Sequence, residues 1–177
     1  MTRYALCIEG SFLSKSMCTL FVFKIQQKGG TSEGFQMWYA LPAARRMEAP
    51  SYHDLRSGAY PIVEAGGLVV RALIGSYVPS ADAGRVRHSS PFDESLMKTP
   101  LTLLDVKLAP GATFSHLAPP SDSLLAYCFR GQCAVAGRQV GLYQCALLAH
   151  DGETLEIANE GSAETRLLVL QGSFTSS

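Results

Sequence analysis

Between residues 66 and 172 the chain is a succession of short apolar segments, each bounded by glycine, proline or other turn-forming residues. Within these segments apolar and polar residues alternate, and almost none of the sequence repeats with the helical period of about 3.6 residues. Around residue 105, for example, Leu104, Val106 and Leu108 fall on one face of the expected strand. Short strands at this spacing predict an all-β fold, which we interpret as a single antiparallel, jelly-roll-like barrel.

The alternation also predicts which side chains point into the barrel. A slip of the register by one residue would turn every apolar set outward, so the pattern fixes the buried face. We expect the core to contain Leu104, Val106, Leu108, Leu155, Ile157 and Val169.

The composition is that of a folded domain without a strong charge signature. Hydrophobic residues make up 47% of the 177 residues and charged residues 17%, so the chain can bury a substantial core. Fifteen basic and fifteen acidic residues give a formal net charge of zero. This balance gives no reason to expect direct binding to nucleic acid or to an anionic membrane surface.

The N-terminal region contains no segment that we expect to act as a signal or a membrane anchor. Its best apolar run, residues 17–23, is much shorter than the roughly 20 residues that span a bilayer. Lysines flank this run, and no small-residue cleavage site follows it. We therefore expect an intracellular protein.

The five cysteines are scattered along the chain and form neither a disulfide framework nor a C-x-x-C motif. Cys128 and Cys133 flank Arg130-Gly131, which we predict to be the turn of a β-hairpin, so the two thiols could face each other. A disulfide there is the lesser alternative, because cysteines inside a cell are normally reduced. We expect buried, reduced thiols.

Outside the predicted barrel we divide the chain into three further parts. Residues 1–33 are an unassigned N-terminal extension that could form a β-hairpin, residues 34–65 a strand and a linker, and residues 173–177 a disordered tail. The strand is predicted in Gly34–Leu41, where the residues alternate before a proline. Within the barrel region, Ser76–Pro100 is polar and rich in Ser, Asp and Gly, which predicts a long surface loop.

Four stretches carry a resemblance to a known family. They read GFQMWYALPAARRMEAPSYHDL from Gly34, TPLTLLDVKLAPGATFSH from Thr99, AYCFRGQCAVAG from Ala126 and DGETLEIANEGSAETRLLVLQG from Asp151. In this order they resemble the pirin family of the cupin superfamily, the first stretch most specifically. Pirins resemble two cupin barrels in tandem, so the resemblance implies that residues 66–172 are the second barrel and that the strand near Gly34 belongs to the first. We interpret the chain as the C-terminal half of a pirin that lacks the metal-binding N-terminal barrel.

The resemblance implies no metal site that transfers to this chain. Pirins hold iron in the first barrel through three histidines and a glutamate, and the corresponding H-x-H and H-x-E motifs do not occur in this sequence. In the second barrel the general cupin metal motifs retain His116 and Asn159, which we interpret as vestigial positions. Ala118, Leu124 and Leu155 stand where further ligands would be, and a lone imidazole makes a poor metal site. We expect neither a metal nor another cofactor.

Two functions of different classes remain open. The first is a non-catalytic, pirin-like domain that acts by protein interaction, as the iron-dependent transcription co-regulators of the family do, in the cytoplasm or the nucleus. The second is an enzyme resembling quercetin 2,3-dioxygenase, or a small-molecule binder, that uses the barrel cavity. No nucleophile–base pair can be assigned from the sequence, because Ser121 and Ser123 lie in a loop after two prolines. We therefore lean against an enzyme.

The surface that we expect to bind a protein partner is the strand near Gly34. Its candidate contact residues are Phe35, Met37, Trp38 and Tyr39. A strand separated from its barrel presents apolar side chains and unpaired backbone groups, both of which favour association. The prediction is therefore self-association or a protein partner at this segment.

Overall fold

The computed structural model describes residues 3–8, 35, 37, 47, 51–82, 86–92 and 100–172. The chain divides into two compact units, one of Met1–Tyr4 with Leu55–Ser176 and the other of Ala5–Asp54 with Ser177. The described residues form strands and two short 3-10 turns, η2 (Ser57–Ala59) and η3 (Ser80–Asp82), with no α-helix. No helix among them is therefore long and apolar enough to cross a membrane.

The strands, in chain order, are β1 (Arg3–Ile8), β2 (Ser51–Arg56), β3 (Ile62–Ala65), β4 (Leu68–Ile74), β5 (Ser76–Tyr77), β6 (His88–Ser89), β7 (Leu101–Leu108), β8 (Thr113–Leu117), β9 (Ser123–Arg130), β10 (Cys133–Val135), β11 (Arg138–Val140), β12 (Cys145–Leu147), β13 (Thr154–Ala158) and β14 (Thr165–Gly172). β1 pairs with β2 in a separate two-stranded sheet, a pairing that the sequence analysis did not predict. The predicted boundaries of the domains stay predictions.

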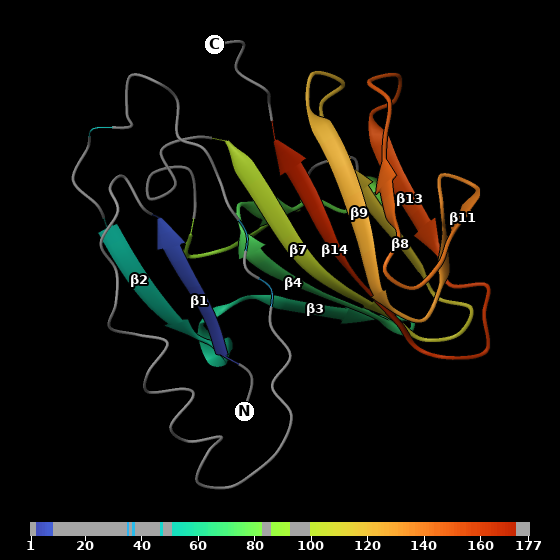
Figure 1. Ribbon diagram of the computed structural model, residues 1–177, viewed down its shortest axis with the longest axis horizontal. Helices are drawn as coiled ribbons and strands as arrows, with labels where there is room; N and C mark the ends of the chain where they lie inside the picture. Colours follow the sequence, from blue (N-terminus) through green and yellow to red (C-terminus); the bar gives the residue numbers. More distant parts are fainter. Residues whose placement is uncertain are drawn as a thin grey trace, which may run out of the picture. The chain divides into compact units, whose positions relative to one another are not determined.

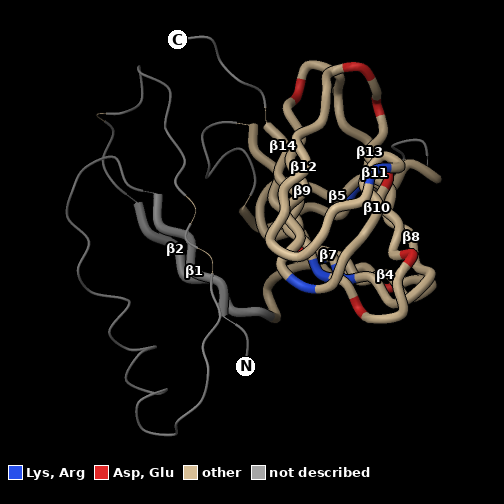
Figure 2. Tube along the Cα trace, turned by 45° about the vertical axis from the view of Figure 1, so that its right-hand side comes forward, with Lys and Arg blue, Asp and Glu red and all other residues tan. Residues whose placement is uncertain are grey.

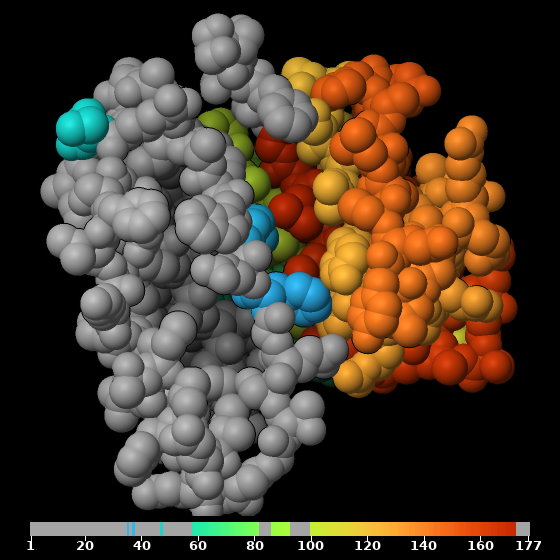
Figure 3. Space-filling view, viewed as in Figure 1, coloured from blue at the N-terminus to red at the C-terminus, as the bar shows by residue number. Residues whose placement is uncertain are grey.

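Two antiparallel sheets make up the barrel. The larger has the strand order β12-β9-β14-β7-β4-β3 and the smaller the order β11-β10-β13-β8 (Figure 1). Residues 123–172, coloured yellow to red, form one continuous part of the surface in the space-filling view (Figure 3). Several acidic residues lie in the connections between strands, and both acidic and basic residues also occur within the strands (Figure 2).

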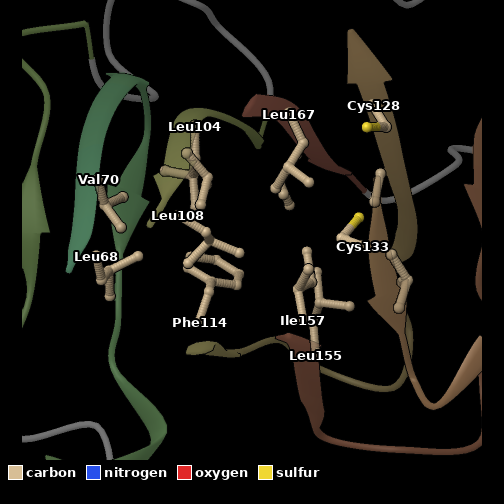
Figure 4. Packing of buried hydrophobic residues seen from close by; sticks show 14 of the residues in the cluster. Leu68, Val70, Leu104, Leu108, Phe114, Cys128, Cys133, Leu155, Ile157 and Leu167 are labelled. Carbon is tan, nitrogen blue, oxygen red and sulfur yellow. The ribbon is translucent and has the colours of Figure 1, made fainter. Parts of the chain in front are cut away.

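The core lies between the two sheets. Leu68, Leu104 and Leu167 of the larger sheet face Phe114, Leu155 and Ile157 of the smaller one (Figure 4). All the residues predicted for the core, Leu104, Val106, Leu108, Leu155, Ile157 and Val169, expose 1% of their surface or less. The predicted antiparallel barrel is therefore confirmed, and so is the prediction of which side chains point into its core.

The larger sheet also carries apolar residues on its other face. β14 pairs with β7 on one side and β9 on the other, and its sequence TRLLVLQG does not alternate. Leu167 is buried in the barrel, whereas Leu168 is half-buried on the opposite face. On β7, Leu103 and Asp105 are buried although they alternate with the barrel-facing residues. A strand that is buried on both faces loses the polar half of its pattern.

The predicted hairpin at Arg130-Gly131 is wrong. β9 belongs to the larger sheet and β10 to the smaller one, so this turn carries the chain from one sheet to the other. Gly131 has a φ of 72°, and a Cβ atom there would lie 2.7 Å from the carbonyl oxygen of Glu164. The sequence signal for a tight turn was correct, but such a turn can form a barrel corner as well as a hairpin.

The prediction of a surface loop over Ser76–Pro100 is only partly correct. The segment contains β5 and β6, which pair with each other, and it buries Tyr77 and Phe92 at 3% and 1% exposure. Gly75 donates a backbone hydrogen bond to the carbonyl of Phe92 at 2.8 Å, and the hydroxyl of Ser90 donates to Leu73 at 2.8 Å. Because the segment is polar in composition, the sequence analysis did not predict that Tyr77 and Phe92 are buried.

Most of the predicted strand near Gly34 lies outside the described residues. Only Phe35 and Met37 are described, and neither is assigned to a strand. Phe35 exposes 49% of its surface and Met37 is half-buried.

Candidate functional site

His116 is the central polar residue of the barrel interior. It lies on β8, where the alternation of exposed and buried residues turns Phe114 and His116 inward. β8 pairs with β13, and the register places His116 beside Leu155. The imidazole exposes only 1% of its surface.

Both ring nitrogens of His116 are engaged by protein groups. The backbone N–H of Val78 donates to Nδ1 at 3.2 Å. Because a backbone N–H can only donate, Nδ1 is unprotonated, and Nε2 carries the proton that it donates to Oε1 of Gln171 at 2.7 Å. Gln171 in turn donates through Nε2 to a carboxylate oxygen of Asp122 at 2.7 Å. These bonds fix one neutral tautomer of the imidazole.

The surroundings of His116 lower its pKa below the ordinary value. Burial is the largest cause, because it disfavours the charged imidazolium. The hydrogen bonds to Gln171 and Val78 oppose this effect, and the positive charge of Arg87 lowers the pKa a little further. His116 therefore stays neutral at neutral pH.

A pH-dependent stability follows from this lowered pKa. The unfolded chain binds a proton on His116 near pH 6.5 and the folded chain only at lower pH, so the contribution is fully present above that value. It is lost as the pH falls toward the folded pKa, with a slope of at most about 1.4 kcal/mol per pH unit. Urea unfolding at several pH values should show that His116→Gln has a weaker acid-side decline than the wild type. An exposed-site control, His150→Gln, should retain the decline; equal slopes for His116→Gln and the wild type would contradict the prediction.

The residues around His116 do not fit a metal ion. Ala118, Leu124 and Leu155, which occupy the other cupin ligand positions, are all buried and have no donor atom. In the part of the chain that the structure describes, no three His, Cys, Asp or Glu side chains are grouped to hold a metal. A divalent ion needs several donors that converge from neighbouring strands, whereas here apolar side chains fill those places.

Asn159, the second vestigial position, has a structural role. Its amide nitrogen donates to the carbonyls of Leu108 and Ala163 at 3.0 and 2.8 Å, and its Oδ1 accepts from the backbone N–H of Gly161 at 3.0 Å. The side chain is 1% exposed and ties the turn after β13 to the end of β7. Its hydrogen bonds account for its presence without a ligand.

Aromatic rings occupy the space beside His116. Tyr77 stacks against Phe114 and His116, with ring centroids 5.5 and 5.9 Å apart. His88 stacks on the same tyrosine at 6.0 Å. The sequence analysis assigned Tyr77 to a surface loop and therefore missed this cluster.

Cys128 and Cys133 are free, buried thiols, as predicted, and both point into the core from different sheets (Figure 4). Cys128 donates to the carbonyl oxygen of Arg130 at 3.4 Å. Burial, together with the neighbouring Cys128, raises the pKa of Cys133 to about 12. Since the thiolate is the reactive form, these cysteines pack as small apolar residues rather than act as nucleophiles.

A serine and a histidine that the sequence analysis left unpaired come together in the structure. The hydroxyl of Ser123 lies 3.2 Å from Nε2 of His150. These residues are separated by 27 positions, and no local motif marks them. Only the pairing of β9 with β12 could have indicated that they are neighbours.

The chain resembles pirins in sequence. It is 28% identical over 148 residues to Pirin-1 of Arabidopsis thaliana, a match that covers 80% of this chain and 47% of that protein. It is 30% identical over 132 residues to a pirin-like protein of Caulobacter vibrioides, covering 74% of this chain and 41% of the relative. No family model matches the chain. The chain spans about half the length of the curated relatives it matches.

The structure resembles cupins. A crystal structure of quercetin 2,3-dioxygenase from Acinetobacter baumannii superimposes with a TM-score of 0.61 at 24% identity, covering 77% of this chain and 44% of that one. At this identity the likeness shows the fold alone. The sequence matches make this chain a homologue of the pirins over about half of their length, and the structural match shows that it has an antiparallel β-barrel fold of the cupin type.

Proposed function

We propose that this chain is a pirin-like cupin domain that acts by protein interaction and not by metal-dependent catalysis. The observation that carries the proposal is the filling of the cupin ligand positions. Leu124 and Leu155 are buried apolar residues, and both nitrogens of His116 are already hydrogen-bonded. Because the interior is filled in this way, we propose that the domain acts through its outer surface. We also propose an intracellular location, cytoplasmic or nuclear.

The alternative is an enzyme or a small-molecule binder that uses the barrel interior. The structural neighbour named quercetin 2,3-dioxygenase supports this alternative, because it shares the fold. The interior of the present barrel opposes it, since the cluster around Phe114 and Leu155 consists of closely packed apolar side chains.

Metal analysis separates the two proposals. We expect the purified chain to hold no stoichiometric iron, copper or manganese and to leave quercetin unchanged, because its second-barrel ligand positions lack donor atoms. Elemental analysis after gentle purification, followed by a spectrophotometric quercetin assay, provides the measurement. One metal ion per chain that is lost in His116→Ala would contradict the proposal and favour the enzyme.

We expect the chain to associate with itself or with a protein partner through the segment near Gly34. The proposed contact residues are Phe35, Met37, Trp38 and Tyr39, of which Phe35 exposes 49% of its surface. Covering one such side chain contributes roughly 1.5–3 kcal/mol, so a few together can drive self-association or partner binding. Sedimentation at a concentration on the order of 50 μM should show a dimer or larger species that Phe35→Ser weakens.

The emission of Trp38, the only tryptophan, provides the control for this experiment. Its spectrum should shift to shorter wavelength on association, because the indole leaves water. A monomer at all concentrations with an already buried Trp38 would rule out this segment as a self-association surface. Val86→Ser, at another exposed apolar residue, is the matched variant and should not alter association.

A further inference from the structure

The pairing of two strands brings Ser123 and His150 to the same end of the larger sheet. Ser123 is the first residue of β9, and His150 follows the end of β12. β12 runs antiparallel to β9 with Leu147 opposite Leu125. Continuing two residues back along β9 and three forward from β12 therefore leads to the serine and the histidine. Their proximity is a consequence of the register and not of a local turn.

The hydrogen bonds orient the imidazole toward the serine. Nδ1 of His150 lies 3.1 Å from the carbonyl oxygen of Pro120, and Nε2 lies 3.2 Å from Oγ of Ser123. A carbonyl oxygen can only accept, so Nδ1 carries the proton and Nε2 keeps its lone pair. The hydroxyl of Ser123 then donates to Nε2. This arrangement has the three parts of an activated nucleophile: a hydroxyl, a base within hydrogen-bonding reach, and a group that orients the base.

Both partners can be reached from solvent. His150 is exposed and Ser123 is half-buried, in contrast to the buried histidine at position 116. We propose that Ser123 and His150 form a nucleophile–base pair that accepts acyl groups from small, activated carboxylic esters. The proposal does not rest on the interaction function above, because the pair lies outside the packed interior.

The chemistry needs no other reactant than the ester and water. Oγ of Ser123 attacks the ester carbonyl carbon while Nε2 of His150 takes the hydroxyl proton. The bond between the carbonyl carbon and the leaving oxygen then breaks while Nε2 of His150 gives the proton to that oxygen, which leaves an acyl-serine, releases an alcohol or phenol and frees the nitrogen to act as a base again. Water attacks the acyl-serine with the same nitrogen as base, and the free acid and the serine hydroxyl are restored.

The exposure of the pair also defines its substrates. Water solvates the oxyanion of the tetrahedral intermediate at an exposed site, whereas a fixed backbone donor typically contributes a factor of about 10²–10³ in rate. The reaction is therefore confined to esters with good leaving groups, such as aryl acetates. Because the pair lies at the surface, the acyl group of the ester does not have to be bulky in order to react.

The test is acylation of the full chain by p-nitrophenyl acetate, with release of p-nitrophenolate and the acetylated residue located by peptide mass spectrometry. Acetyl transfer to Ser123 is expected in the wild type and is lost in Ser123→Ala. In His150→Gln the rate of acetylation at Ser123 should fall roughly hundredfold, which is the usual contribution of a general base. Each rate is measured as a function of pH, and the difference between the wild type and His150→Gln gives the contribution of the imidazole as a base.

Matched variants separate this reaction from general surface acylation. Ser121→Ala and His88→Gln change a neighbouring exposed serine and a second histidine, and both should acylate as the wild type does. All variants are made in a Cys145→Ser background, because that thiol is exposed and could compete for the ester. Thermal unfolding of each variant confirms that it is folded. Acetylation that avoids Ser123, or that is unchanged in His150→Gln, would overturn the proposal.

Discussion

Replacing Asp105 with alanine is expected to lower the free energy of unfolding by about 3 kcal/mol, one of the largest losses among single polar substitutions in this chain. Asp105 lies on β7 in the middle of the larger sheet and exposes only 5% of its surface. Arg166 contacts both of its oxygens through Nη2, at 3.0 and 2.9 Å, and Arg71 contacts one through Nη1 at 3.3 Å. The carboxylate thus lies between two guanidinium groups from the flanking strands.

Removing this carboxylate has two costs. It eliminates charge-assisted hydrogen bonds, and it leaves two like charges on β4 and β14, the strands on either side. The arginine side chains are 21% and 27% exposed, so solvent relieves part of the repulsion and keeps the loss near the lower end of the range for buried pairs. Equilibrium urea unfolding at neutral pH is the measurement.

A surface ion pair between β7 and the residue that precedes β14 provides the control. Lys107 and Glu164 approach to 2.9 Å, but their side chains are 44% and 40% exposed. Glu164→Ala should therefore cost less than about 1 kcal/mol. If Asp105→Ala and Glu164→Ala lower the free energy of unfolding equally, the burial of Asp105 does not increase the cost of removing its carboxylate. The prediction is then wrong.

Leu155→Ala is expected to cost about 3 kcal/mol, because it leaves a cavity at the centre of the barrel. Leu155 exposes none of its surface and packs in the cluster that contains Phe114 and Leu104. In the cupin motif this position would hold a histidine ligand, but here it holds packed hydrocarbon. The substitution should therefore reduce stability and should not alter any metal content.

Leu147→Ala is the matched control for this substitution. Leu147 lies on β12 and exposes 74% of its surface, so the same change in side chain should alter the free energy of unfolding by about 0.5 kcal/mol or less. The comparison uses urea midpoints together with the slope of the unfolding transition. A loss below about 1 kcal/mol for Leu155→Ala would show that the barrel collapses around the missing side chain, against the prediction.

The sequence predicted the barrel and its core because the alternation of apolar and polar residues indicates which face of each strand is buried. Leu104, Val106 and Leu108 alternate with more polar neighbours, and their burial follows from the period of a strand. The same rule could not identify Asp105 as buried. A carboxylate in a strand normally indicates the solvent face, and here the ion pairs of Asp105 with arginines of the two neighbouring strands offset the cost of its burial.

The turns and the site were less predictable for a topological reason. Gly131 indicates a tight turn. The local sequence does not specify whether the chain after this turn returns along the same sheet or crosses to the other sheet. Likewise, Ser123 and His150 become neighbours through strand pairing over 27 residues, a long-range relation that composition and motifs do not contain. His116 was found from a motif position, yet its tautomer depends on Val78 and Gln171, which only the fold brings to it.

The position of β14 between β7 and β9 has a consequence for the folding of the chain during translation. The chain is synthesised from its N-terminus, so β7 and β9 emerge while the strand that joins them is still to be made. Until residues 165–172 appear, both strands present open edges that can pair with neighbouring nascent chains. Completion of the larger sheet is therefore a late event, and its long-range pairings make that step slow. A chaperone that shields these edges during translation would increase the yield of soluble protein.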